Sequence, residues 1–212
     1  MNNLFNPDNK FMQLGFKLFD LISLQIAVVL FSLPIVTAGA AFTAMHKVLL
    51  QIYRDQSSSI WKEFLTSFWE NFKQATILWI SLLTICCFIC VDFFLIMVSA
   101  PSWISYLLLI PGGYLLLAGS WIFIFQSRYH NTVIQTIKNA SKMILLHPLY
   151  TVLNAGIMLC PIVVLMVTYK AIPVILLLGC TLPGVLRASI YSRIFDTLEK
   201  TNGRDSEEQQ SE

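Results

Sequence analysis

The stretch FSLPIVTAGAAFTA, residues 31–44, closes one long apolar run and opens another. Pro34 has no N–H with which to continue a helix, and the residues from Thr37 to Ala41 are all small. Such a stretch is typical of a tight reversal between two membrane-embedded helices. Small residues also let two helix backbones approach closely, which is the usual basis of helix contact in lipid. The turn around Pro34, Thr37 and Gly39 therefore predicts a helical hairpin in the membrane.

The composition of the 212-residue chain agrees with a membrane protein. Hydrophobic residues make up 56% of the chain and charged residues 12%, and the mean hydropathy is +0.68. A soluble domain carries about 25% charged residues, so this chain has too few charges for a solvated surface. The basic residues are too few and too scattered to indicate nucleic-acid binding. The five cysteines all lie inside apolar runs, and we interpret them as packing residues.

Six apolar runs have roughly the 20 residues that a helix needs to cross a bilayer. They cover residues 14–33, 35–53, 76–99, 103–125, 148–168 and 174–194. Two segments between them, 60–75 and 128–147, have apolar side chains on one helical face. We predict an all-α membrane bundle of three hairpins with two cytoplasmic interfacial amphipathic helices. For residues 60–75, packing on the other spans of the same chain is an equal alternative.

The predicted membrane domain covers residues 1–200 and is followed by a polar, disordered tail, residues 201–212. With six spans, Lys170 lies on one side of the membrane and the other lysines and arginines lie on the opposite side. Positive residues favour the cytoplasm, which places both termini inside. A five-span arrangement, in which residues 35–53 do not cross, moves Lys10 and Lys17 outside and fits less well.

Asp92 is the ionisable residue of the third predicted span. An acid inside a membrane span is costly and indicates function by default. We therefore consider a role for Asp92 in transport or proton coupling. The alternative is an acid close to the outer interface, since Asp92 lies about 10 Å of helix rise from the end of its span.

Two predicted spans contain helix breakers near their middle. Pro111-Gly112 interrupts the fourth span and Pro183-Gly184 interrupts the sixth. Breaks at corresponding positions of repeated units point to a transporter substrate site, because the freed backbone groups can coordinate a ligand. A simple kink, with the backbone satisfied by neighbouring helices, is the alternative.

The remaining polar residues indicate no catalytic centre. The histidines, such as His46, are predicted near the cytoplasmic interface and have no metal-binding spacing. Arg187 could pair with Asp196 or with lipid head groups, and we expect it to contact lipid or neighbouring residues. We find no phosphate-binding loop, nucleophile elbow or paired carboxylates, and predict a protein that is not an enzyme and holds no cofactor or metal.

Residues 33–41, LPIVTAGAA, followed by the aromatic-rich segment 68–73, resemble the YesL family of bacterial membrane proteins. The resemblance continues in order through the segments SRY at 127–129, KNA at 138–140 and RIFD at 193–196. The chain departs from the family at Gln25, where an asparagine is expected, and at Ala38, where a larger aliphatic residue is common.

This resemblance implies a multi-pass protein of the bacterial plasma membrane, found mostly in Firmicutes, with no established activity. Family members often lie near genes for carbohydrate uptake and degradation. The resemblance therefore implies an accessory component of carbohydrate uptake, with a carbohydrate ABC transporter as its partner within the lipid bilayer. A small-solute transporter and a membrane signalling modulator are the alternatives.

Overall fold

Helices make up all the regular structure of the part that the computed structural model describes, residues 10–54, 59–99, 107–129, 132–168, 170 and 172–192. They are α1 (Lys10–Ser32), η1 (Ile35–Thr37), α2 (Ala38–Tyr53), α3 (Ile60–Ser99), α5 (Leu109–Arg128), α6 (Val133–Leu146), α7 (Pro148–Val167), α8 (Ile172–Leu178) and the final helix Thr181–Ser192. Five candidate spans are long and apolar enough to cross a membrane, and the bent pair of α8 and the final helix makes a sixth. The predicted all-helical, multi-pass fold is confirmed.

The turn between α1 and α2 is built as its sequence predicts. Pro34 ends the first helical run, and the hydroxyl of Thr37 lies 2.7 Å from the carbonyl oxygen of Phe31, to which it donates. From across the bundle, the indole N–H of Trp79 donates to the carbonyl oxygen of Ile35 at 2.7 Å. The turn is therefore held both by its own threonine and by α3.

The small residues after the turn allow α2 to pack tightly on α3. A Cβ atom at Gly39 would lie 2.7 Å from the carbonyl oxygen of Ala75 and would overlap the side chain of Trp79. Ala40 and Ala44 are fully buried in the same helix. A glycine is needed at position 39 because the backbone of α3 occupies the space that any side chain would take.

The structure corrects the boundary predicted after residue 75. Residues 60–75 and 76–99 form one continuous helix, α3, of 40 residues, about 60 Å long. No glycine or proline interrupts this stretch, and the helix continues from the amphipathic part into the apolar part. The rings of Phe64 and Phe68 lie 5.5 Å and 4.9 Å from that of Phe31 on α1. The aromatic face of residues 60–75 thus packs largely on the chain itself, although Trp69 is exposed.

The second predicted amphipathic segment forms a separate helix, α6. Its buried face consists of Thr136, Ala140 and Met143, whereas aliphatic side chains such as Leu145, which is 82% exposed, point away from the protein. The hydroxyl of Thr136 donates to the side-chain oxygen of Gln126 on α5 at 3.2 Å. A small polar contact therefore joins α6 to the bundle, while apolar residues are left on its outer side.

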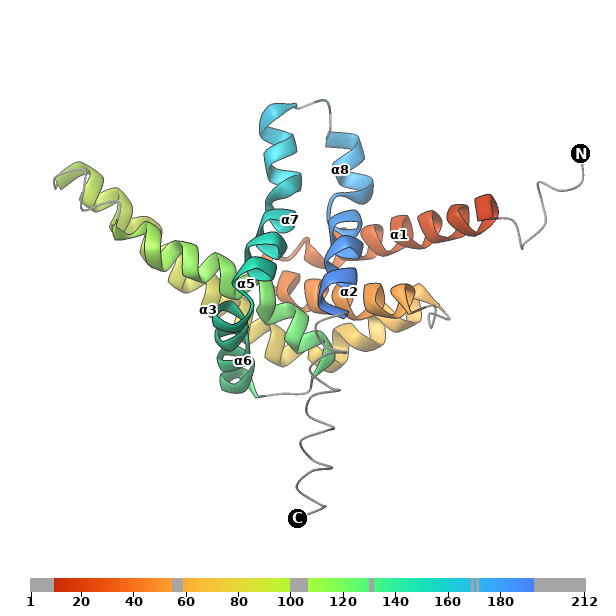
Figure 1. Cartoon of the computed structure of the whole chain (residues 1–212), viewed down its shortest axis with the longest axis horizontal. Coiled ribbons are helices and arrows are strands. Elements are labelled where there is room, and N and C mark those ends of the chain that lie inside the picture. Colours follow the sequence, from red (N-terminus) through yellow and green to blue (C-terminus); the bar gives the residue numbers. More distant parts are fainter. Residues whose placement is uncertain are drawn as a thin grey trace, which may run out of the picture.

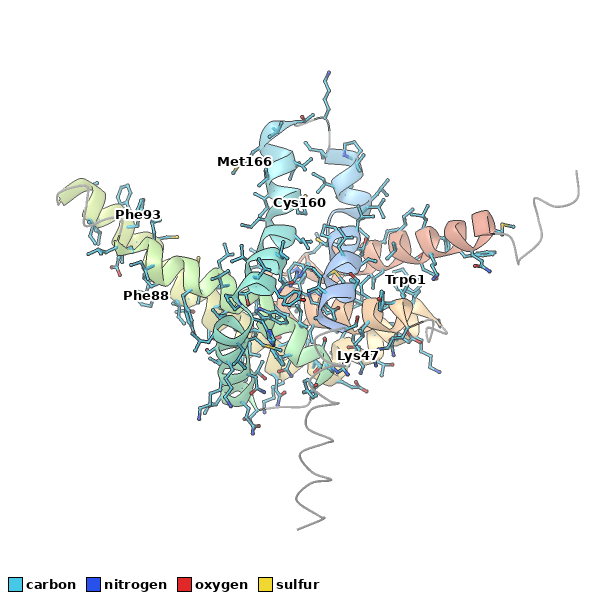
Figure 2. All side chains as sticks on the ribbon, viewed as in Figure 1. Lys47, Trp61, Phe88, Phe93, Cys160 and Met166 are labelled. Carbon is cyan, nitrogen blue, oxygen red and sulfur yellow. The ribbon has the colours of Figure 1, made fainter. Side chains whose placement is uncertain are left out.

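Figure 1 shows how the helices spread from this packed centre. The outer half of α3 extends to one side, and α7 and α8 rise from the middle of the molecule. Figure 2 shows the side chains along these extensions, among them Phe88 on α3 and Met166 on α7, which is 83% exposed. Exposed apolar side chains along helices of this length are typical of contact with lipid. The predicted tail, residues 201–212, lies outside the described residues.

Candidate functional site

The final membrane span is bent by 47° between α8 and the helix Thr181–Ser192. Pro183 lies in the first turn of the second helix, where it removes the N–H that would otherwise bond to the carbonyl group of Gly179. A Cβ atom at Gly179 would overlap the carbonyl oxygen of Ile175, so the chain needs glycine at the bend. The break predicted at Pro183-Gly184 is present, and it begins one turn before the proline.

Gln25, in the middle of α1, satisfies the backbone at this bend. Its side-chain oxygen accepts hydrogen bonds from the backbone N–H groups of Cys180 and Thr181, both at 3.1 Å. These donors would be left without partners at the start of a helix. Because Gln25 is 2% exposed, the interaction is shielded from water. The N–H groups of Cys180 and Thr181 are therefore bound to protein and are not available to a ligand.

A buried arginine lies two turns beyond the bend. The Nε atom of Arg187 donates to the side-chain oxygen of Asn154 on α7 at 2.6 Å, and its Nη2 atom donates to the carbonyl oxygen of Ser120 on α5 at 2.7 Å. The amide nitrogen of Asn154 also contacts Ser120, so the three residues join α5, α7 and the final helix. Arg187 is 6% exposed. Of the contacts expected for Arg187, the one present is contact with neighbouring residues, which enclose it; Asp196 lies outside the described residues.

A pocket of about 280 Å³ lies beside this cluster, between the final span and helices α2, α3, α5 and α7. One wall is aromatic: the ring of Trp79 lies 6.2 Å from that of Phe42 and 5.8 Å from that of Phe123. The charged or ionisable nitrogen groups in the lining belong to His46 and Arg187. The pocket is thus an apolar chamber with one polar end.

His46 lies inside the bundle, which corrects the expectation of an interfacial histidine. It is 2% exposed, and its Nδ1 atom is buried with no hydrogen-bond partner. Its ring packs edge-on against Tyr191, with the ring centres 6.2 Å apart. His46 and Arg187 are close enough to interact electrostatically. Buried polar atoms are normally paired, so this free nitrogen marks the polar end of the pocket.

The residues chosen from sequence lie in separate places. Pro183 lines the central pocket, and Gly184 packs next to Leu49. Gly112 lines a different, shallow hollow against the outer half of α3. Asp92 is exposed on that same half of α3 and is not part of the central pocket.

The break predicted in the middle of the fourth span is wrong for the described residues. Pro111 lies in the first turn of α5, which then runs without interruption to Arg128. A proline is tolerated there because the first N–H groups of a helix have no partner within it. The backbone N–H of Gly112 donates to the carbonyl oxygen of Leu108 at 3.2 Å, so the helix forms directly around the Pro-Gly pair.

Sequence reasoning missed Gln25, Asn154 and Arg187 as members of one site. Each stood out as a polar residue within or next to an apolar run, which was the available signal. Their partners are up to 156 residues away in the chain, and helical spacing contains no information on such pairs.

These features define a class of protein: a multi-pass helical membrane protein with a largely apolar internal pocket. The model of a family described as "Protein of unknown function, DUF624" matches residues 18–93, which include most of α1, all of α2 and most of α3. YesL proteins are members of that family, so the match agrees with the resemblance in this part of the chain. No curated protein and no solved structure matches the chain.

Proposed function

We propose that this protein is a small-solute transporter with the central pocket as its substrate site. The observation that supports this function is the bend of the final span beside the pocket. Discontinuous helices line the substrate sites of many transporters, because irregular backbone in a membrane is tolerated only where it is buried or lines a cavity. Five helical segments contribute to the pocket, so a shift of one against another changes access to it.

Our proposal includes the setting of this activity. The protein is non-enzymatic and lies in the bacterial plasma membrane with both termini in the cytoplasm. The positive-inside distribution of the basic residues and the resemblance to the YesL family support this placement. A membrane-impermeant thiol label that reacts at a Ser57→Cys variant from outside intact cells would contradict it.

The accessibility of Cys180 tests transport without knowledge of the solute. Cys180 lines the pocket at the bend and is partly exposed there. The variant to prepare replaces the other cysteines with serine: Cys86, Cys87, Cys90 and Cys160. A transporter must open its site to each side in turn, so we expect a charged, membrane-impermeant thiol reagent to label Cys180 when applied to either side of proteoliposomes.

The matched control keeps Cys160 as the single cysteine. Cys160 lies on α7 (Figure 2), is exposed, and does not line the central pocket. Lipid covers such a surface in the membrane, so we expect no labelling of Cys160 from either side. Labelling of Cys180 from one side alone, or from neither, would contradict a transport cycle that passes through this pocket.

The second candidate is an accessory role in carbohydrate uptake, with a carbohydrate ABC transporter as partner. It is supported by the resemblance at residues 33–41 and by the exposed apolar surfaces of α3 and α7, which are available for contact within the membrane. Co-purification in mild detergent tests this candidate. A protein that reproducibly purifies without a transporter would count against it.

A further inference from the structure

The charge of the buried Arg187 side chain indicates which chemical class of solute the pocket can bind. A guanidinium group stays protonated under all ordinary conditions, and burying it in a membrane bundle is costly unless an anion or several acceptors compensate. Among the described residues, its acceptors are the neutral oxygens of Asn154 and Ser120, and it forms an ion pair with no carboxylate. No carboxylate of the described residues therefore neutralises the positive charge at the polar end of the pocket.

Arg187 also has donors to spare. A guanidinium carries five N–H groups, and the two hydrogen bonds to Asn154 and Ser120 use two of them. The same two bonds hold the side chain in place from two helices. An arginine fixed on one side with donors left on the other is suited to bind a carboxylate, whose oxygens match the spacing of the guanidinium nitrogens.

The second, independent observation is the unpartnered Nδ1 atom of His46. His46 lines the same pocket, and an imidazole can donate to or accept from a ligand. The N–H groups at the start of the final helix do not compete for a ligand, because Gln25 already binds them. The nitrogen groups of the lining that can bind an anion are thus those of Arg187 and His46.

The rest of the pocket favours an apolar body. Phe42, Trp79 and Phe123 form its aromatic wall, and Met158 and Ile162 of α7, both exposed, also line it. A volume of about 280 Å³ corresponds to roughly nine water molecules at 30 Å³ each, enough for a small amphiphile. A molecule with one anionic end fits this chamber better than a sugar, which would bury several hydroxyl groups against apolar walls.

We infer that the pocket binds an amphiphilic monocarboxylate, with the carboxylate on Arg187 and His46 and the apolar body against the aromatic wall. This inference rests on the proposed function and names the substrate class of the same site. The carboxylate can come from the aqueous phase, as a small organic acid, or from the bilayer, as a free fatty acid. Both sources present the same chemistry to Arg187.

Calorimetric titration of the protein in phosphatidylcholine nanodiscs tests the inference, with empty nanodiscs as the reference. The probes are phenylacetate, the neutral and similarly shaped phenylacetamide, and palmitate. Because hydrogen bonds to charged groups are the stronger ones, we expect the amide to bind about 30-fold more weakly than phenylacetate. Binding of palmitate without phenylacetate also supports the class and assigns the bilayer as the source. Failure of both acids to bind, or equal binding of acid and amide, would overturn the inference.

Three variants locate the binding site. Arg187→Gln keeps donors for Asn154 and Ser120 but removes the charge, and we expect it to lose the preference for the acid over the amide. Gly119→Leu fills the pocket without altering the polar end, because a Cβ there meets its nearest neighbour at 4.0 Å; we expect it to weaken both probes. Lys142→Gln, on the exposed face of α6, is the control and should bind as the unmodified protein does. Unchanged acid binding in both pocket variants would overturn the site.

The outcome separates this inference from the proposed function. Labelling of Cys180 from both sides together with no acid binding leaves transport standing and removes the substrate class. If acid binding depends on Arg187 but Cys180 is labelled from one side alone, the ligand class is supported and transport is contradicted. Circular dichroism melting of Arg187→Gln shows whether that variant is folded. If it is unfolded, the binding measured with Gly119→Leu tests the location of the site.

Discussion

Replacement of Gln25 by leucine tests how the bend of the final span is held. Leucine is close to glutamine in size but has no acceptor, so the N–H groups of Cys180 and Thr181 lose the oxygen that now lies 3.1 Å from each. A buried donor without a partner costs about 1–3 kcal/mol, which gives about 2–6 kcal/mol for the pair. Interhelical hydrogen bonds in membrane proteins average only about 0.6 kcal/mol, because the chain finds other partners. Allowing for such relaxation, we expect a loss of about 2 kcal/mol.

The matched control is Gln51→Leu. Gln51 lies on α2 and its side-chain oxygen is buried with no hydrogen-bond partner, so its replacement removes an unsatisfied acceptor. We expect this variant to be as stable as the unmodified protein or more stable. Reversible unfolding in mixed dodecylmaltoside and SDS micelles, followed by circular dichroism, measures both. Equal losses in the two variants would refute the conclusion that Gln25 holds the bend, since the effect would then reflect the removal of any buried amide.

Two further changes probe the packing of the first three helices. Gly39→Ala places a methyl group against Trp79 and the carbonyl oxygen of Ala75, and we expect it to destabilise the fold by about 1–3 kcal/mol in the same unfolding assay. Gly156→Ala on α7 meets nothing within 4 Å, so it should have no destabilising effect, and a similar loss in both would contradict the close approach at Gly39. Glu70→Gln removes the ion pair with Lys47, which spans 2.7 Å near the surface. We expect a change within about 1 kcal/mol that shrinks further as salt is added, and a large, salt-independent loss would be inconsistent with an exposed pair.

The helical hairpins could be predicted because their information is local. Pro34 and the small residues up to Ala41 are adjacent in the chain and predict the turn and a close helix contact. The helix that Gly39 contacts is α3, however, and not α1 as the hairpin predicts. The bend near Pro183 could be predicted for the same reason, since proline removes a specific backbone donor. The six candidate spans likewise follow from length and hydropathy.

The site could not be predicted because its contacts join distant parts of the chain. Gln25 meets Cys180 across 155 residues, and Arg187 meets Asn154 across 33. In a single sequence, Gln25 and Arg187 appear as isolated polar residues, and nothing in their spacing shows that each has a specific partner. The helix boundary predicted after residue 75 is wrong for another reason. The polarity of the side chains changes there, but no glycine or proline interrupts the backbone, so α3 continues.

The unbroken length of α3 has a mechanical consequence. One half of this helix packs on α1 and α2, the other half runs beside the start of α5 (Figure 1), and Trp79 lies between the two halves and forms part of the pocket wall. A rod of about 60 Å with no hinge acts as a lever. When bilayer thickness changes, long helices respond by tilting, and a tilt of α3 as one rod would move Trp79 together with the outer half of the helix. We therefore expect the shape of the pocket to change with the thickness of the surrounding membrane.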